Sequence, residues 1–151
     1  MLALIQRVTQ ASVVVDEQVV GAIGLGLMAL IGVERDDDEA CAERLAERVC
    51  GYRVFEDSEG RMNRSVTDVG GGLLLVPQFT LPADTRKGMR PGLSPAAEPV
   101  VGERLFTRFV EEVRARGHQP QTGRFRTHMQ VSLTNDGPAT FMLAARPAAK
   151  I

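Results

Sequence analysis

The sequence predicts a single domain that combines α-helices with β-strands. Two segments carry apolar residues at helical spacing, and several short runs are rich in β-branched residues or alternate between apolar and polar side chains. A chain of 151 residues is long enough to bury roughly two-thirds of the surface that it exposes when unfolded. Because no linker or internal repeat interrupts residues 1–151, we expect one domain and one main core.

The N-terminal segment is predicted to form a β-hairpin. Residues Leu2–Val15 have the composition of a long strand that continues through or bends at Thr9–Ser12. The turn Asp16–Gln18 then leads into a second strand over Val19–Ile23.

A glycine-containing stretch follows the hairpin. Residues Gly24–Ala29 formally match the dinucleotide-binding pattern G-x-G-x-x-A. That pattern requires a helix to begin at the glycines, whereas a strand-like apolar run, Leu27–Val33, begins here. We therefore do not interpret the match as a cofactor site.

The first amphipathic helix is predicted to follow the acidic run Asp36–Glu39. Carboxylates in this run provide N-cap groups and a charge that favours a helix N-terminus. The helix ends near Gly51, and its buried face is formed by Cys41, Leu45, Val49 and Tyr52. Cys41 and Cys50 would lie roughly 13 Å apart on such a helix, beyond the reach of a disulfide, so we interpret both as small buried residues.

The stretch Gly70–Leu81 is the most informative part of the chain. Its apolar run Leu73–Val76 is typical of a short buried strand, which Pro77 ends because proline has no backbone N–H. Polar groups at the end of a buried strand are often functional, since the strand holds them rigidly. Such groups are provided here by Gln78, Phe79 and Thr80.

Less regular segments lie on either side of this stretch. Before it, we expect a short strand at Arg53–Phe55, a turn at Glu56–Gly60 and a polar loop at Asn63–Ser65. After it, the long loop from Pro82 to Pro99 is typical of a functional or flexible segment. This loop carries a basic group, which either contacts phosphates or is simply solvated, formed by Arg86, Lys87 and Arg90.

The C-terminal third is predicted to contain the second helix and the last strands. Apolar residues spaced from Val101 to Val113 form the helix, with Gly117 placed as its C-terminal cap. Further expected elements are a strand at Met129–Leu133, a turn at Thr134–Pro138, a last strand at Ala139–Ala145 and a frayed tail at Arg146–Ile151.

Composition excludes several classes of protein. The formal net charge of −1 argues against a broadly basic nucleic-acid binder, although a protein that contacts only a few phosphates remains open. The apolar runs are far shorter than the ~20 residues of a membrane span, and Arg7 interrupts any signal-peptide core. We therefore expect a cytoplasmic protein without membrane contacts.

Local spacing does not reveal a standard catalytic set. The sequence contains no nucleophile elbow, P-loop, H-E-x-x-H or C-x-x-C motif. His118 and His128 are the histidines that could act as bases near neutral pH, and neither has a partner defined by spacing. Thr80 has a hydroxyl group but no activating base nearby in the sequence.

Two motifs resemble a known family. Residues PQFTL at 77–81 and NDGPAT at 135–140 are similar to the S-Q-F-T-L and N-x-G-P-x-T motifs of the D-aminoacyl-tRNA deacylases. Further segments occur in the family's order up to about Ala145: IQRV with Arg7, FEDSEGRMN, ADTRKG and GRF…MQVSLTNDGP.

The resemblance implies a fold and an activity. The implied fold is an α+β three-layer sandwich with two layers of mixed, largely antiparallel strands, two main helices packed on one side, and assembly into a homodimer. The implied reaction is hydrolysis of the ester that joins a D-amino acid, or mischarged glycine, to the 3′-terminal adenosine of tRNA. The resemblance implies no metal or organic cofactor. It further implies that the 2′-hydroxyl of the terminal ribose assists the reaction, so that no side chain need act as the general base.

The resemblance also implies roles for particular residues. The backbone N–H groups of Gln78 and Phe79 would stabilise the oxyanion, with Thr80 lining the site. Gly137 and Pro138, joined by a cis bond, would enter the partner subunit's pocket and reject L-amino acids. Supporting or pocket-lining roles fall to Arg7, Phe125, Met129 and Asn135.

One position departs from the family's pattern, and two other functions stay open. Pro77 replaces the family's usual serine, so a hydroxyl and an N–H are lost and any role of that serine cannot transfer. The alternatives are an esterase with Thr80 as nucleophile for other acyl groups, and a non-catalytic dimeric RNA-binding module that uses the 82–99 loop.

Overall fold

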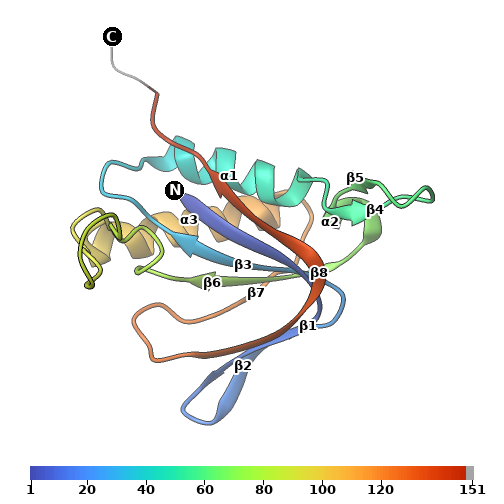
Figure 1. The fold of residues 1–151 in the computed structure, drawn as a ribbon, viewed down its shortest axis with the longest axis horizontal. Helices are drawn as coiled ribbons and strands as arrows, with labels where there is room; N and C mark the ends of the chain where they lie inside the picture. Colours follow the sequence, from blue (N-terminus) through green and yellow to red (C-terminus); the bar gives the residue numbers. More distant parts are fainter. Residues whose placement is uncertain (149–151) are drawn as a thin grey trace.

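Two helices cover one face of a six-stranded sheet in the computed structural model, which describes residues 1–148 (Figure 1). The α+β class is confirmed. The main sheet has the order β2-β1-β3-β6-β7, with β8 paired to the other edge of β1, and β4 pairs with β5 in a small separate sheet. The strands are β1 (Leu2–Val15), β2 (Gln18–Ile23), β3 (Gly26–Gly32), β4 (Phe55–Glu56), β5 (Met62–Arg64), β6 (Gly72–Pro77), β7 (Gln121–Thr122) and β8 (Gln130–Ala144). The helices are α1 (Glu39–Gly51), α2 (Val66–Val69) and α3 (Pro99–Ala115).

Strand β1 organises the sheet because it is paired along both edges. One edge pairs with β3 over Leu2–Val8 and then with β2 over Ala11–Val15, while the other edge pairs with β8 along nearly its whole length. All three neighbours pair with β1 in antiparallel orientation, whereas β6 pairs in parallel with β3 and with β7. The first half of β1 therefore lies within the sheet that the helices cover, and its second half continues into the β1-β2 hairpin, as predicted.

Both faces of the sheet are buried, which explains the uninterrupted apolar run in β6. Leu73 and Leu75 belong to the core between the sheet and the helices, together with Leu45 of α1 and Phe109 of α3. The alternate residues of β6 belong to a second, smaller core on the opposite face, formed by Val8, Ala11, Val13, Val15, Met28, Leu74 and Val76. A strand buried on both faces has no polar side to show, so its sequence does not alternate.

The two main helices begin and end close to the predicted residues. The Asp38 carboxylate caps α1 by accepting a hydrogen bond from the Cys41 N–H at 3.0 Å, and the helix ends at Gly51. Pro99 starts α3, where its missing N–H is tolerated. Both cysteines are buried and unpaired, as predicted, and burial raises the pKa of the Cys50 thiol to about 11.

Two sequence predictions before the Gly70–Leu81 stretch were wrong in detail. The strand expected at Arg53–Phe55 is β4, Phe55–Glu56, which begins two residues later. The loop expected at Asn63–Ser65 instead holds the end of β5 and the N-cap of α2, because Ser65 and Asp68 form a reciprocal capping box. Helix α2 spans four residues, too few for a hydrophobic period to reveal it.

The turn expected at Thr134–Pro138 is also wrong. These residues lie inside β8, which runs from Gln130 to Ala144 without a break. They form a bulge, because the step from Gln6 to Val8 on β1 is matched by the longer step from Thr140 to Asn135 on β8. The extra residues are looped out while the strand continues. Because a bulge and a hairpin turn both use residues such as Asn, Asp, Gly and Pro, the sequence alone does not tell them apart.

The chain ends outside the regular structure. Arg146–Ala148 have no regular secondary structure, and the rest of the predicted frayed tail, 149–151, lies outside the described residues. Within residues 1–148, none of the helices is both long and apolar enough to cross a membrane.

The glycine stretch at 24–29 runs directly into β3, so the strand predicted after these glycines is confirmed and no helix begins there. Gly26 pairs with Gly72 of β6, and a Cβ atom on Gly26 would overlap the Gly72 backbone. Gly24, by contrast, has open space around it. Gly26 is therefore required for close approach of two strands.

We predict that Gly26→Ala lowers the free energy of unfolding by more than about 3 kcal/mol, because the clash is with rigid backbone at the centre of the sheet. Gly24→Ala is the matched control and should change it by less than ~1 kcal/mol. Urea unfolding followed by circular dichroism measures both. Equal stability of the two variants would contradict the packing described here.

Candidate functional site

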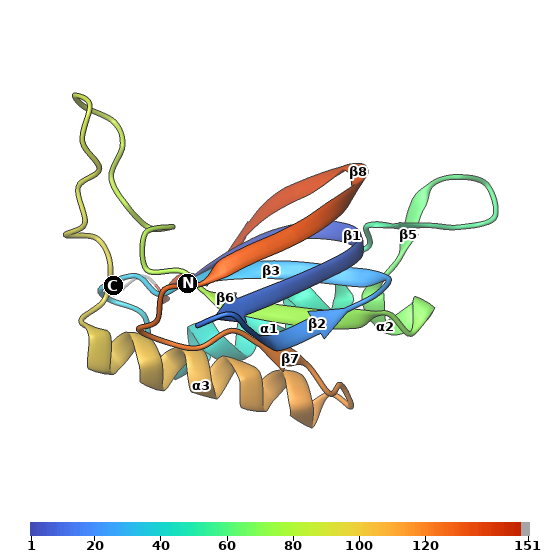
Figure 2. The same ribbon diagram turned by 90° about the horizontal axis from the view of Figure 1, so that it is seen from below.

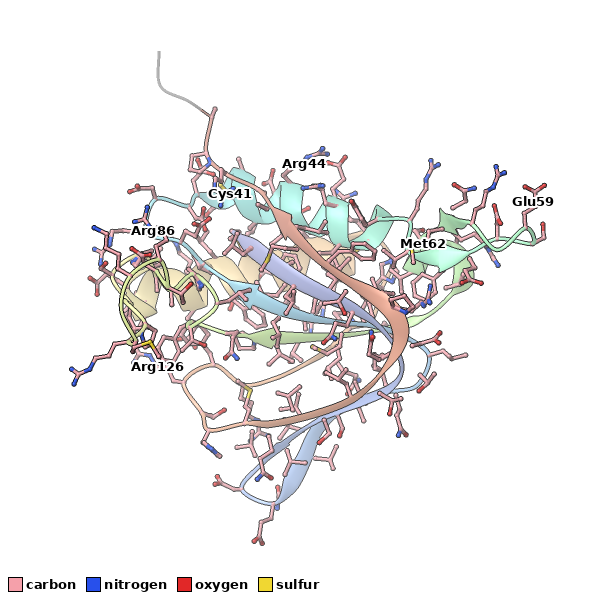
Figure 3. The ribbon with its side chains drawn as sticks, viewed as in Figure 1. Cys41, Arg44, Glu59, Met62, Arg86 and Arg126 are labelled. Atoms are coloured by element: carbon pink, nitrogen blue, oxygen red, sulfur yellow. The ribbon has the colours of Figure 1, made fainter. Side chains whose placement is uncertain are left out.

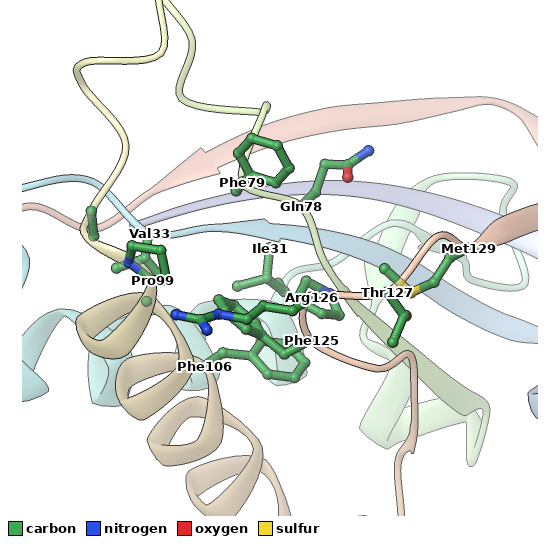
Figure 4. A pocket seen from close by; sticks show the side chains of 13 residues that line it. Ile31, Val33, Gln78, Phe79, Pro99, Phe106, Phe125, Arg126, Thr127 and Met129 are labelled. Carbon is green, nitrogen blue, oxygen red and sulfur yellow. The ribbon is translucent and has the colours of Figure 1, made fainter. Parts of the chain in front are cut away.

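A cavity of about 410 Å³ opens where β6 ends (Figure 4). Its walls come from the ends of β3 and β6, the first turns of α3 and the segment between β7 and β8. The described lining residues are Ile31, Val33, Pro77, Gln78, Phe79, Ala97, Pro99, Gly102, Phe106, Phe125, Arg126, Thr127 and Met129. The parallel pairing of β3 with β6 brings their carboxyl ends together, which makes this edge a natural place for a ligand.

The cavity is mainly apolar and aromatic. In Figure 4 the Phe79 ring stands on one side of the opening and the Phe106 and Phe125 rings on the other. Phe125 packs against α3 at Gly102, where a Cβ atom would approach the ring to 3.3 Å. Phe79 is 61% exposed although it is a large apolar residue. An exposed aromatic side chain at the mouth of an aromatic cavity is typical of a ligand contact.

Two backbone N–H groups in the PQFTL motif differ in their availability. The Gln78 N–H donates to the Ile31 carbonyl at 2.7 Å and so extends the pairing of β6 with β3. This differs from the expectation that it would be available to an oxyanion. Within the described chain neither the Phe79 N–H nor the Thr80 N–H makes a hydrogen bond, whereas the Leu81 N–H bonds the Gln78 carbonyl. Of these two free donors, the one on Phe79 belongs to a residue that lines the cavity.

Thr80 and the two histidines lie away from the cavity lining. Thr80 is exposed in the turn after Phe79. The Nε2 atom of His118 lies 2.9 Å from the Thr67 hydroxyl, and partial burial lowers the pKa of His118. His128 is exposed between Thr127 and Met129 without lining the cavity. Within the described residues, no group of three or more His, Cys, Asp or Glu side chains could hold a metal ion.

The second motif, NDGPAT, forms a separate cluster around Arg7. This arginine is 8% exposed, and its Nε donates to the Asp136 carbonyl at 2.9 Å while Nη1 donates to the Val54 carbonyl at 2.6 Å. The Asp136 carboxylate lies 3.3 Å from the same Nε. A buried arginine thus links the bulge of β8 to the Val54 carbonyl. This agrees with the supporting role that the resemblance implies for Arg7.

Asn135 closes the bulge from the other side. Its Nδ2 donates to the carbonyls of Arg7 at 3.0 Å and Ala139 at 3.2 Å. A Cβ atom on Gly137 would overlap the Asn135 Oδ1, so only glycine fits beneath this side chain. The Gly137–Pro138 peptide bond is cis, and both residues are exposed.

One chain does not bring the two motifs together. Arg7 pairs with Leu27 near the start of β3, whereas Ile31 at the cavity lies four residues further along the strand, or roughly 13 Å at a rise of about 3.3 Å per residue. Gln78, Phe79, Phe125 and Met129 share the cavity; Arg7, Asn135, Gly137 and Pro138 share the bulge. Thr80 belongs to neither set.

The loop from Pro82 to Pro99 extends away from the sheet beside the N-terminus of α3 (Figure 2). An isolated bridge between Asp84 and Gly92 closes its base. Arg86 makes two side-chain hydrogen bonds of 2.9 Å to the Asp84 carboxylate, which hold the pKa of Asp84 at about 2. Because this pair is internally neutral, Lys87 and Arg90 at the exposed tip carry the excess positive charge of the loop.

Sequence reasoning missed several cavity residues. Ile31 and Val33 were assigned only to a strand, Pro99 only to the end of a loop, and Gly102 and Phe106 only to a helix. Arg126 and Thr127 lie between two predicted pocket residues, Phe125 and Met129. Their position between two predicted pocket residues was the one sign in the sequence that they could line the cavity. The spacing alone did not show which of these side chains face it.

An aromatic cavity at a strand end, on an α+β scaffold and without a local nucleophile–base pair, defines a ligand site in which shape and backbone groups dominate. Residues 4–144 match the family model described as D-Tyr-tRNA(Tyr) deacylase. The chain belongs to this family.

Individual relatives agree with this assignment. A protein named D-aminoacyl-tRNA deacylase from Alkalilimnicola ehrlichii is 63% identical over 99% of each chain. One of the same name from Stenotrophomonas maltophilia is 61% identical over 95% of this chain and 99% of its own. A solved structure titled c-Myc DNA Unwinding Element Binding Protein is 34% identical, covers 97% of this chain and 100% of its own, and superposes with a TM-score of 0.91. A structure of a probable eukaryotic D-amino acid tRNA deacylase, 18% identical with a TM-score of 0.82, shares the fold over 94% of this chain and 97% of its own.

We predict that Asn135→Asp lowers the free energy of unfolding by about 1 to 2 kcal/mol, because a carboxylate cannot donate to the two carbonyls that the amide now satisfies. Ser132→Ala, an exposed change in the same strand, is the control and should stay within ~0.5 kcal/mol. Urea unfolding at one fixed protein concentration measures both variants. An unchanged midpoint for Asn135→Asp would show that these hydrogen bonds do not hold the bulge.

Proposed function

We propose that the protein is a cytoplasmic editing hydrolase that cleaves the ester of D-aminoacyl-tRNA, and of mischarged glycyl-tRNA, to free amino acid and tRNA. The observation that carries this proposal is the aromatic cavity at the end of β6, which is lined by Gln78 and Phe79 of one family motif. A cavity of about 410 Å³ with aromatic walls suits the base and ribose of a terminal adenosine. Membership of the deacylase family gives the reaction class.

The proposed assembly is a homodimer in which each chain completes the other's site. Gly137 and Pro138 are exposed and lie near the opposite end of β3 from the cavity of their own chain. A second copy could present them to the cavity, in the three-layer homodimer that the family resemblance implies. Exposed apolar residues of β8 such as Met142, at 52%, are consistent with a covered face.

The proposed basis of selectivity is exclusion. An L side chain would point into carbonyl groups of the partner's bulge, which Arg7 and Asn135 hold in place, whereas a D side chain would project away from them. Glycine has no side chain to exclude and would be admitted. Rejection of L substrates by about 10⁴-fold requires about 5.5 kcal/mol, which is more than differences in methyl contacts provide. A rigid backbone wall can supply this.

The proposed chemistry needs no side-chain nucleophile. A water oxygen attacks the ester carbonyl carbon and gives a proton to the neighbouring 2′-hydroxyl. The 2′-hydroxyl passes its own proton to the ribose 3′-oxygen as the ester bond to that oxygen breaks. The Phe79 N–H, which makes no hydrogen bond within the described chain, is the donor for the developing oxyanion. Pro77 has no N–H of its own to add.

The proposed contact with the rest of the tRNA is the basic tip of the 82–99 loop. Lys87 and Arg90 are exposed there, and the loop joins the two sides of the cavity because it follows Phe79 and ends at Pro99. Met89, between them in the chain, is 99% exposed. These groups would reach phosphates of the acceptor strand, with an affinity that falls as salt rises.

We predict rapid release of amino acid from D-Tyr-tRNA and Gly-tRNA and release at least 10³-fold slower from L-Tyr-tRNA, because the wall acts on the L side chain alone. Acid-precipitable radiolabel measures all three substrates. Equal rates on D and L substrates would contradict the chiral filter. Binding of tRNA without release from any substrate would instead support the RNA-binding module.

We further predict that Thr80→Ala retains at least a third of the wild-type rate, because Thr80 does not line the cavity. A D-Tyr-tRNA ending in 2′-deoxyadenosine should be hydrolysed at least 10²-fold more slowly, since it lacks the assisting hydroxyl. Single-turnover rates on both tRNAs test this. Loss of turnover in Thr80→Ala, with normal hydrolysis of the 2′-deoxy substrate, would favour the Thr80 esterase.

We also predict that Gly137→Ala reduces the ratio of D to L hydrolysis about tenfold or more, because the added Cβ displaces Asn135 and loosens the bulge. Gly51→Ala, at a position with open space, is the control and should keep the wild-type ratio. The ratio of kcat/KM on D-Tyr-tRNA and L-Tyr-tRNA is the measurement. An unchanged ratio in Gly137→Ala would remove the bulge from the filter.

A further inference from the structure

Arg126 stands out among the residues that line the cavity. It is the one charged side chain among the described lining residues, and it makes neither an ion pair nor a hydrogen bond with any other described residue. Figure 4 shows its side chain extending across the cavity opening towards Pro99. The guanidinium is thus held at the edge of an apolar site without a protein partner.

The backbone of Arg126 is left-handed, with φ of 59°. An L-residue other than glycine, asparagine or aspartate rarely takes this conformation, because its Cβ then crowds the backbone. The turn that imposes it is held by the Thr127 hydroxyl, which donates to the Arg124 carbonyl at 2.8 Å. Glycine would suit this position better for stability, so the arginine side chain needs another explanation.

The surroundings of Arg126 favour an anion. Arg86 lies at the same end of the molecule as Arg126, opposite Glu59 and Met62 (Figure 3), although Arg86 is already paired with Asp84. The cavity lining contains no carboxylate among its described residues. An unpaired guanidinium beside an uncharged cavity attracts a phosphate strongly and can bind it through two hydrogen bonds.

We propose that Arg126 binds the phosphate on the 5′-oxygen of the terminal adenosine of the substrate tRNA. This inference rests on the proposed function, in which the cavity holds that adenosine. The 5′-phosphate is the first anion outside the nucleoside, so it lies at the cavity opening when the nucleoside lies inside. Arg126 is then a positioning residue, which aligns the RNA end and contacts neither the ester nor the attacking water.

The direct test is titration of the protein with adenosine and with the methyl ester of 5′-AMP, which carries one negative charge like an internucleotide phosphate. We expect the wild type to bind the phosphate ester about three- to tenfold more tightly than adenosine. The preference should fall to about one in Arg126→Ala and Arg126→Gly and be partly kept in Arg126→Lys. Arg124→Ala, at an exposed arginine outside the cavity lining, should keep the wild-type preference.

A second readout uses the tRNA. In Arg126→Gly we expect KM for D-Tyr-tRNA to rise at least threefold with kcat unchanged, and the slope of log KM against log salt to fall by about 0.7, the value for one phosphate of a single strand. Arg126→Gly should also unfold at no lower urea concentration than the wild type, because glycine accepts the left-handed backbone.

These results separate the inference from the proposed function. The inference is overturned if the wild type shows no preference for the phosphate ester, or if Arg126→Ala retains it, even when D-Tyr-tRNA is hydrolysed normally. The proposed function is overturned if the wild type fails to hydrolyse D-Tyr-tRNA, whatever the titrations show. Equal loss of preference in Arg124→Ala would indicate general charge attraction and would also overturn the assignment to Arg126.

Discussion

The double pairing of β1 is the constraint on which the other features depend. The strand exchanges backbone hydrogen bonds with β3 and then β2 on one edge, and with β8 on the other. Its buried side chains are shared between two cores, with Ile5 in the helix-covered core and Val13 in the smaller one. Because one strand serves both cores, the ladder with β8 changes register near Val8, and the extra residues of β8 form the bulge that carries Gly137 and Pro138.

The same arrangement divides the proposed site between two places. Parallel pairing of β3 and β6 sets Gln78 and Phe79 at the carboxyl ends of two buried strands, beside the start of α3. The bulge lies near the other end of β3, held by a buried arginine and an asparagine. Both parts present backbone groups on rigid supports. Rigid N–H and carbonyl groups suit oxyanion stabilisation and steric exclusion, since neither requires a titrating side chain.

Charge is organised locally and not through the whole chain. The formal net charge is −1, yet Arg126 crosses the cavity opening and the nearby loop ends in Lys87 and Arg90. Arg86 does not add to this, because Asp84 pairs with it. A nucleic acid that contacts such a protein at its 3′ end would meet these positive charges around the cavity. Net charge alone therefore gives little information about an RNA substrate.

The sequence by itself determined those elements that depend on side chains close together in the chain. The cap at Asp38, the apolar faces of α1 and α3, the β1-β2 turn and the buried run of β6 follow from side chains a few residues apart. The residues of both motifs were likewise named from the sequence, through resemblance and not through periodicity. Tertiary structure alone decided that Thr134–Pro138 is a bulge, that the Gln78 N–H bonds to Ile31, and that Arg126 reaches the cavity. Each of these depends on a neighbouring strand or helix far away in the sequence, and a chain read in order contains no information on that neighbour's register.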